Sequence, residues 1–421
     1  MKHYPLLENK AAKLFFGLYL TAMLFLSRDT LFSSCIIGFT KSQLYMLVLI
    51  GLLGICFLVK NRGNMKDILL DSRMLVFGIL TAVLLIPMLV KQDWQLMYFS
   101  ILLCPLFAVF LTWFTTSRDV AKYYVVILCL LGVYSVIATY GLRELAQAGI
   151  LNPRIFYNSN EWDFFDFGFA YAVTWEYWHR NFGIFREPGV YQFFVLLAVY
   201  LTNYTVNWNK NWHMWVCNVI LAVTMATTFA IGGYAELGLF VIFLYCDKKY
   251  YREKWGRVAG ILAVLMVIAM VVFFFLQMKR LDFGQTIYYE FYDMAVRLFT
   301  KSDSSTDRMN AILTNLQIFS KNPLVGDTIG NVLHGTNHNT SSTLLLYAIV
   351  GVVGGTLNAA AWVALAWKRD RNLFGNLVLL LILFMSFNTQ NLTANVFFWL
   401  FPMMALTEKG LPLIKLSAKK E

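Results

Sequence analysis

A series of long apolar runs, most of them about 18 residues or more, constrains this chain more than any other feature of its sequence. A helix of ~20 residues, rising 1.5 Å per residue, crosses the ~30 Å hydrocarbon core of a bilayer. Every backbone N–H and C=O group in that core must be bonded within the protein. Barrel strands would be shorter and would alternate in polarity. The runs therefore predict membrane-spanning helices.

The composition agrees with this interpretation. Hydrophobic residues make up 59% of the 421 positions and charged residues only 14%, against about 25% charged in an average soluble domain. We predict an all-α fold: a polytopic integral membrane protein with a single transmembrane domain over residues 1–421 and about 12 spans. The predicted spans are 14–27, 42–59, 74–90, 95–115, 121–141, 190–206, 213–231, 234–246, 258–277, 341–366, 373–387 and 391–407.

Lysine and arginine in short loops predict the orientation, because basic short loops stay in the cytoplasm. With the N-terminus placed inside, the inside tails and loops carry 22 of the 35 basic residues, and the short outside loops carry 3. Both termini are therefore predicted to be cytoplasmic. Two long loops are then extracytoplasmic: loop A at 142–189 and loop B at 278–340.

Charge and cysteine content argue against several other functions. The net charge of +11 is spread over short loops between spans and forms no single basic stripe, so nucleic acid is not expected as a partner. The six cysteines are far apart and include no C-x-x-C motif. They predict no disulfide framework, and no cluster typical of a metal site is evident.

Loop A is rich in aromatic residues, among them Trp175, Tyr177 and Trp178. One interpretation is an interfacial belt, in which the rings lie among lipid headgroups. The other is that one or more of these rings stack on sugars, whose C–H faces suit aromatic surfaces. The sequence leaves both interpretations open.

Loop A ends directly before a span, with Arg180, Gly183, Arg186, Glu187 and Pro188 close together. Charged side chains at a membrane surface are costly unless they are paired. Arginine binds phosphate through a planar fork, and its charge does not titrate. Arg180 and Arg186 are therefore candidates for phosphate binding, and anchoring at headgroups is the alternative.

The middle of loop B predicts an amphipathic helix of about four turns on the membrane surface. Thr306 or Asp307 can cap its start, and the pair at 322–323, Asn-Pro, ends it. Arg308 falls in the first turn, where free N–H groups and the helix dipole favour an anion. We predict a phosphate site there, with a solvated arginine as the alternative. The apolar stripe of the helix is Ile312, Leu313, Leu316 and Phe319.

Two further titratable side chains lie near predicted span ends. His338 follows loop B where the chain re-enters the membrane, and Glu236 lies near the outer end of the span at 234–246. A lone histidine is more often structural than catalytic, so position alone does not assign His338 a role. A carboxylate near lipid is expected to be paired, and we predict a partner for Glu236.

Three segments resemble the O-antigen ligase and polymerase family of bacterial surface-polysaccharide enzymes. Residues 180–188 are similar to that family's R-x-x-G-x-F-x-(E/N)-P segment before a span. Arg308, followed by Asn-Pro-Leu-x-Gly at 322–326, resembles its R…NPLxG segment. His338 and the following Asn, then Gly-x-x-Gly at 351–354, resemble its H-N…G-x-x-G segment. The interval of eleven residues between those two parts is longer than is typical of the family.

The resemblance covers about 165–365 closely and implies a metal-independent, cofactor-free glycosyltransferase in the bacterial cytoplasmic (inner) membrane. It implies that the donor is an undecaprenyl-pyrophosphate-linked oligosaccharide. The implied partners are a glycan acceptor, the lipid bilayer, a chain-length regulator and a flippase. The residues expected to be catalytic are Arg180, Arg308 and His338. Those expected to bind substrate are Arg186, Glu187, Trp175 and Trp178.

Within that class, His338 is expected to accept the proton of the acceptor hydroxyl. Glu187 is the alternative base, or else the group that orients an arginine. The Glu-Pro-Gly after Arg186 and the longer interval after His338 favour a repeat-unit polymerase. The alternative enzyme is a ligase, which transfers the chain to lipid A–core or another final acceptor.

A function of another class, a polysaccharide flippase or exporter without chemistry, also remains open. Transporters of that kind carry internal repeats and charged groups inside their spans. The notable charges of this chain lie on the predicted outer loops instead, which favours an enzyme.

Overall fold

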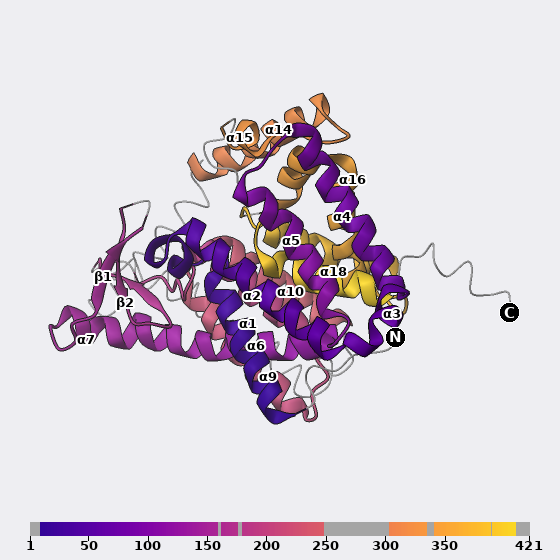
Figure 1. The fold of residues 1–421 in the computed structure, drawn as a ribbon. Coiled ribbons are helices and arrows are strands. Elements are labelled where there is room, and N and C mark those ends of the chain that lie inside the picture. Colours follow the sequence, from indigo (N-terminus) through magenta and orange to yellow (C-terminus); the bar gives the residue numbers. More distant parts are fainter. Residues whose placement is uncertain are drawn as a thin grey trace.

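The computed structural model describes residues 9–158, 161–175, 179–247, 303–334, 341–388 and 390–409. These residues form a mostly helical structure with one small antiparallel sheet (Figure 1). Every predicted span within these ranges coincides with a helix to within a few residues, and the span predicted at 258–277 lies outside them. Hydropathy along the chain therefore located the helices correctly.

Four helices in the described ranges are long and apolar enough to cross a membrane. They are α2 (Phe39–Lys60), α4 (Ser72–Lys91), a continuous helix over Ser117–Gln147, and α16 (Ser342–Ala366). Two more apolar helices are shorter, α5 (Leu96–Leu111) and α17 (Leu373–Phe387). Four such helices are typical of a membrane protein, while the total of about 12 spans stays a prediction.

The continuous helix over Ser117–Gln147 has three parts: α6 (Ser117–Ile137), a π-helical turn η3 (Ala138–Leu142) and α7 (Arg143–Gln147). It therefore runs on into the region predicted as loop A. The other helices described are α1 (Lys10–Leu26), η1 (Phe32–Ile36), η2 (Arg62–Asn64), α3 (Met65–Leu69), α8 (Pro188–Tyr204), α9 (Asn211–Thr227), α10 (Ile231–Asp247), α14 (Asp303–Lys321), α15 (Ile329–His334) and α18 (Val396–Lys409).

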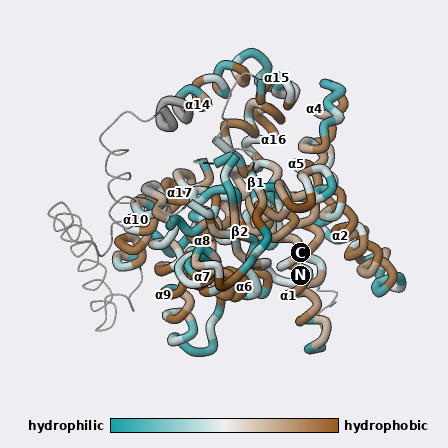
Figure 2. Tube along the Cα trace, turned by 90° about the vertical axis from the view of Figure 1, so that its left-hand side faces the viewer, coloured by the Kyte–Doolittle hydropathy of each residue, from teal (hydrophilic) through white to brown (hydrophobic). Residues whose placement is uncertain are grey.

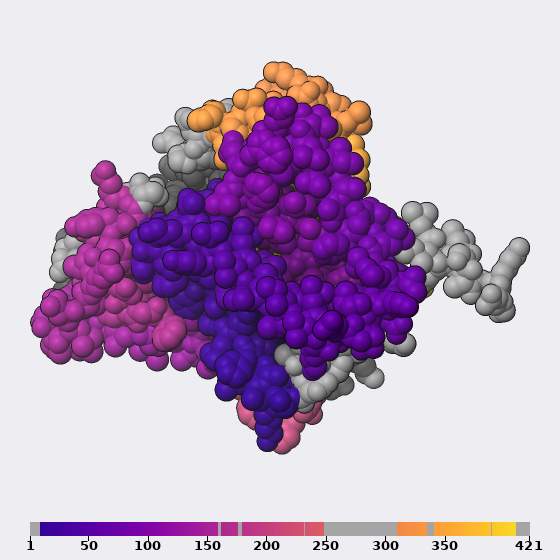
Figure 3. Space-filling view, in the orientation of Figure 1, coloured from indigo at the N-terminus to yellow at the C-terminus, as the bar shows by residue number. Residues whose placement is uncertain are grey.

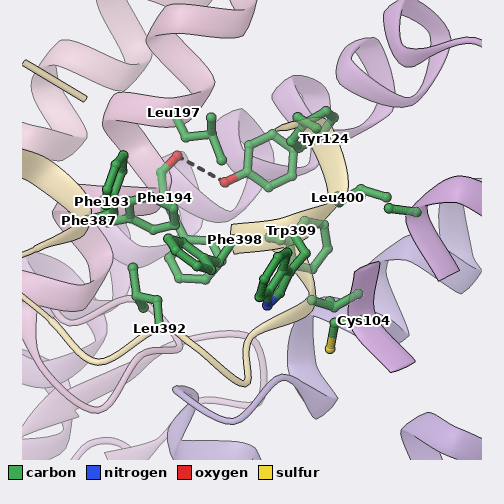
Figure 4. Close-up of a cluster of buried hydrophobic side chains, with 14 of the residues drawn as sticks. Cys104, Tyr124, Phe193, Phe194, Leu197, Phe387, Leu392, Phe398, Trp399 and Leu400 are labelled. Carbon is green, nitrogen blue, oxygen red and sulfur yellow. Dashed lines mark hydrogen bonds between the residues drawn. The ribbon is translucent and has the colours of Figure 1, made fainter. Parts of the chain in front are cut away.

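The core centres on α8 and α18, whose side chains are buried along most of both helices. Aromatic rings fill it: Phe194 of α8 and Phe397 of α18 have centroids 6.1 Å apart. Two polar groups among these rings have acceptors. The hydroxyl of Tyr124 donates to the Phe194 carbonyl at 3.1 Å (Figure 4), and Trp399 Nε1 donates to a loop carbonyl at 2.8 Å. These bonds offset the cost of burying a polar group.

Apolar side chains also lie on the outside of the bundle. Along α2 the exposed residues include Leu44, Val48, Leu52, Ile55 and Val59. In Figure 2, hydrophobic stretches, coloured brown, also run along the helices next to α2. A soluble protein rarely exposes so continuous an apolar surface, whereas a helix that faces lipid must do so.

A three-stranded sheet within loop A corrects the all-α prediction. Its strands are β1 (Arg154–Tyr157), β2 (Asp163–Asp166) and β3 (Tyr171–Val173), antiparallel and in the order β1-β2-β3. Aromatic side chains pack across them: Phe156 lies 5.7 Å from Phe164 and 5.3 Å from Tyr171, between ring centroids. Strands of three or four residues are too short to show an alternating pattern in the sequence, so the aromatic cluster appeared there only as loop.

The helix predicted in the middle of loop B is present as α14, which has 19 residues and starts at Asp303, before Thr306. Its apolar stripe is divided, however. Phe319 packs against Tyr347 of α16 with ring centroids 5.5 Å apart, while Leu313 and Leu316 are exposed. The helix therefore packs against the bundle as well as presenting an apolar face outward.

The two loop regions occupy different parts of the molecule. α14 and α15 lie together at the top of Figure 1, beside one end of α4, and the sheet of loop A lies at the left. In the space-filling view the N-terminal helices cover the face toward the reader, with α14 and α15 above them (Figure 3). Loop A and the α14–α15 pair therefore approach the bundle separately.

Candidate functional site

Residues 180–188 connect loop A to α8, and Asn181 holds this segment in place. Its backbone N–H donates to the carbonyl of Thr227 at 2.9 Å, and its Nδ2 donates to Ser135 Oγ and Thr227 Oγ1, both at 3.0 Å. Its Oδ1 accepts the N–H of Gly183 at 2.9 Å. Asn181 is fully buried, so these bonds form where water does not compete. The segment is therefore fixed against α6 and α9.

Gly183 lies in the middle of this segment with a φ of +56°. A Cβ atom there would come within 2.7 Å of the ring of Tyr191. Its carbonyl accepts the N–H of Tyr171 at 2.8 Å, which ties the segment to β3. The glycine in the R-x-x-G-x-F-x-E-P pattern is thus required by a turn and by close packing.

Arg180 reaches across to the turn between α9 and α10, where its Nη2 donates to the carbonyl of Phe229. Phe229 itself has a φ of +48°, an uncommon conformation for a residue with a side chain. This arginine is therefore held beside the start of α10 rather than extended into water.

The start of α10 also packs closely against α8. A Cβ atom on Gly233 would lie 2.9 Å from Oε1 of Gln192, which is buried. Glu236, one turn further along α10, is buried with 1% of its surface exposed. Arg180 therefore binds the turn that begins this helix, and α10 carries a buried carboxylate a short way along it.

Arg186 is paired with an acidic residue that the sequence did not point to. Its Nε lies 3.6 Å from Oδ1 of Asp29, and its backbone N–H donates to the Asp29 carbonyl at 3.0 Å. Asp29 is 1% exposed, and its Oδ2 accepts a bond from Asn395 Nδ2 at 2.9 Å. Asp29 comes from the turn after α1 and Asn395 from the residues before α18, so three distant segments meet here.

Glu187 was predicted either as the base or as the group that orients an arginine. It is the residue before α8 and does not cap that helix with its side chain, and Pro188 occupies the first helical position. In the described part of the chain its carboxylate forms neither an ion pair nor a hydrogen bond. Asp29, and not Glu187, is the acidic residue that orients Arg186. The carboxylate of Glu187 is thus uncommitted among the described residues.

The second and third motif segments interlock. Asp327 N donates to the carbonyl of Ala348 at 2.7 Å, and Val352 N donates to the carbonyl of Pro323 at 2.7 Å. These bonds join the Asn-Pro-Leu-x-Gly segment to a kink in α16, where Gly351 has a φ of +71° and breaks the helical geometry. The segment between α14 and α15 therefore binds at the kink of α16, where the helical hydrogen bonds are interrupted.

Lys91 at the end of α4 and Asp93 just after it fasten the same region, and neither was selected from the sequence. Lys91 Nζ donates to the carbonyls of Asp327, at 3.0 Å, and Ile349. Asp93 Oδ2 accepts the backbone N–H of Ile329 at 2.6 Å and so caps the start of α15. The only hint in the sequence is a Lys-x-Asp pair directly after an apolar run.

Arg308 lies in α14, but the helix begins at Asp303, so the predicted cap at Thr306 or Asp307 is wrong and Arg308 lies beyond the first turn. His338 lies outside the described residues, in the interval between the end of α15 and the start of α16. The role predicted for each stays a prediction.

His179, the residue before Arg180, forms a cluster with the end of the long helix. Its Nε2 lies 3.3 Å from Oε1 of Glu144, and its ring stacks on Tyr140 at 6.3 Å between centroids. Burial lowers the pKa of His179 to about 4; nearby Arg143 lowers it further, and Glu144 opposes them. This imidazole is therefore neutral at physiological pH.

Trp175 lies beside Trp162, with ring centroids 6.4 Å apart, and 45% of its surface is exposed. Its carbonyl accepts a bond from Arg143. Trp178 lies outside the described residues. The exposed ring of Trp175 fits either predicted use, sugar stacking or headgroup contact.

Within the described ranges no group of three or more His, Cys, Asp and Glu side chains could hold a metal ion. Comparison of the chain with models of protein families, with curated proteins and with solved structures finds no match in any of the three.

Proposed function

We propose that this protein is a polysaccharide repeat-unit polymerase of the bacterial cytoplasmic membrane. It transfers an undecaprenyl-pyrophosphate-linked glycan to a sugar hydroxyl of the acceptor at the outer face of that membrane. The observation that carries the proposal is the segment 180–188, whose two arginines and one glutamate follow each other into α8 with different partners. Arg180 binds the Phe229 carbonyl, Arg186 pairs with Asp29, and Glu187 has no partner in the part of the chain that the structure describes.

The reaction is a single displacement. The acceptor oxygen forms a bond to the anomeric carbon while the bond from that carbon to the diphosphate oxygen breaks, with inversion. Negative charge builds on the leaving diphosphate, and preorganised guanidinium groups lower the barrier by stabilising it. In this mechanism Arg180 and Arg308 supply the charge, and no metal ion is required.

The acceptor hydroxyl must lose its proton as the new bond forms. His338 accepts it in the proposed mechanism, because a neutral imidazole is the usual base near pH 7. Glu187 is the alternative base. Its carboxylate is partly exposed and has no partner in the described ranges, so a substrate hydroxyl can reach it.

The second candidate is a ligase that transfers the glycan to lipid A–core or another final acceptor. The proposed polymerase has a chain-length regulator and a separate flippase as partners.

The third candidate is that this protein is itself a flippase or exporter without chemistry. It is disfavoured because Arg180, Arg186 and Glu187 gather at the start of α8, where loop A meets the bundle, rather than within a helix.

The test is an assay of the purified full chain with lipid-linked repeat units. Longer lipid-linked chains support the polymerase, and product on an added lipid A–core acceptor supports the ligase. Unchanged substrate contradicts both enzymes. Arg180→Met should abolish product, while Arg118→Met, an exposed arginine at the start of α6, should leave it unchanged.

A further inference from the structure

The turn after α1 lies directly beside residues 184–186. Thr30 and Phe185 form an antiparallel bridge, and Leu31 N donates to the Ile184 carbonyl at 2.8 Å. Arg28 and Asp29 stand just before this bridge, and Arg186 stands just after its other strand. The backbone pairing therefore gathers Arg28, Asp29 and Arg186, which we name the bridge cluster.

The bridge cluster holds two guanidinium groups and one carboxylate. Asp29 is already engaged on both oxygens, by Arg186 at 3.6 Å and by Asn395 at 2.9 Å. Burial lowers the pKa of Arg28 to about 10; Asp29 raises it, and Arg186 lowers it. The charge of Arg186 thus acts on Arg28, and the cluster keeps one positive charge in excess.

Both guanidinium groups contain a buried nitrogen without an acceptor. Arg28 Nη1 and Arg186 Nε make no hydrogen bond in the described part of the chain, since 3.6 Å to Asp29 is too long for one. A buried charged donor without an acceptor is costly, and a bound ion is one of the few explanations for such a group. The guanidinium of Arg28 also lies over the ring of Phe39, 4.9 Å from its centroid, which limits where it can turn.

We propose that the bridge cluster is an anion site that takes a lipid-borne phosphate or diphosphate group. Arg28 and Arg186 donate to the phosphate oxygens, and Asp29 holds Arg186 in position from behind. The side chain of Arg186 is 39% exposed, so the site opens to the surface. To name the donor's diphosphate as the ligand rests on the proposed function, whereas a phospholipid headgroup has the same chemistry.

The experiment measures binding to the purified full chain in a neutral detergent. The probes are undecaprenyl pyrophosphate and, in a separate titration, phosphatidylglycerol. Arg28→Met should raise the Kd by tenfold or more, because it removes the charge and the hydrogen-bond donors together. The affinity of Arg28→Lys should lie between those of Arg28→Met and the wild type, because lysine keeps the charge but lacks the planar fork. Arg118→Met, at an exposed position, should bind as the wild type does.

An effect on undecaprenyl pyrophosphate alone assigns the site to the donor, and an equal effect on both probes assigns it to lipid phosphate in general. Wild-type affinity of Arg28→Met for both probes overturns the anion site. If Arg28→Met does not fold, Arg28→Gln with unchanged thermal unfolding decides the question in the same way. A wild-type protein that binds donor in an Arg28-dependent manner but makes no polymer contradicts the proposed function and leaves the anion site standing.

Discussion

Gly326 packs against the backbone just before Gly351, and Gly351 packs against the backbone just before Gly326. A Cβ atom on Gly326 would lie 2.5 Å from the carbonyl oxygen of Ala348, and one on Gly351 would collide with the backbone of Leu324. Both glycines have positive φ angles, +69° and +71°. The contact between loop B and α16 therefore has room for backbone only, and it holds α14 and α15 against the bundle.

This packing predicts that Gly351→Ala destabilises the protein. The new Cβ meets backbone atoms that cannot turn away, and an L-residue at positive φ adds strain, so we expect a loss of about 1–3 kcal/mol or more. Thermal unfolding in detergent measures it. Gly54→Ala on α2 is the control, because its Cβ would meet nothing within 4 Å. Equal unfolding temperatures for the two variants would contradict the interlock.

The orientation is tested by labelling single cysteines with a membrane-impermeant reagent in intact spheroplasts. Cys56 and Cys246 are exposed, so a cysteine-free background is needed. Asn152→Cys in loop A and Ser320→Cys on α14 should label in intact cells, because the excess of basic residues in short loops places them outside. Asn64→Cys, in a loop predicted to be cytoplasmic, should label only after lysis. The reverse pattern refutes the topology.

Arg308→Lys tests the need for a planar guanidinium near the start of α14. The lysine variant keeps the charge but loses the bidentate fork, so we expect normal expression and a loss of polymerisation of roughly tenfold or more. Lys321→Met, in the last turn of the same helix, is the matched control and should keep full activity. Full activity of Arg308→Lys would mean that diffuse positive charge suffices.

His338 is tested by the pH–rate profile on one lipid-linked substrate. If neutral imidazole is the base, activity rises with pH through an ionisation near its pKa, ~6.5 for an ordinary histidine. His338→Ala should cost roughly 10²-fold or more and remove that step, while His334→Gln, at the end of α15, should change neither. A His338→Gln variant with a near-normal rate and the same profile would move the role to Glu187 or Glu236.

His179 makes a different pH prediction, on stability. The pKa of the folded-state imidazole is about 4, against 6.5 for the ordinary group. Between these values the unfolded chain binds a proton that the folded protein does not, so stability falls as pH decreases from 6.5 toward 4. His179→Gln should reduce the fall in unfolding temperature between pH 6.5 and 4. His213→Gln, in the first turn of α9, should leave it unchanged. Parallel curves for wild type and His179→Gln would exclude the effect.

Much of the fold was predictable because helix position depends on neighbouring residues in the chain. The apolar runs located the long apolar helices of the described ranges, and the apolar stripe with Asn322-Pro323 located α14 and its end, although the helix starts at Asp303, before the predicted cap. The sheet of loop A was not predictable, because its strands have only three or four residues and are held together by rings from β1, β2 and β3 at once. The prediction of an all-α chain is wrong at this point.

The candidate site divides in the same way. Arg180, Arg186 and Glu187 were selected because they follow each other in one short segment. Their partners were not, because Asp29, Phe229 and Asn395 belong to other helices and turns, and the bond between Asp29 and Asn395 joins positions 366 residues apart. Lys91 and Asp93 were missed for the same reason: the carbonyl of Asp327 and the N–H of Ile329 that they bind lie 236 residues away along the chain.

By itself the sequence determined that this chain belongs in a membrane and which stretches of it are helical. Hydropathy acts on each stretch separately, so these properties require no knowledge of which helices become neighbours. Only the tertiary structure decided that Arg186 pairs with Asp29 rather than Glu187, and that Gly326 and Gly351 lock loop B to α16. Ion pairs and backbone contacts extend over a few ångströms, and those distances exist only after the helices have packed.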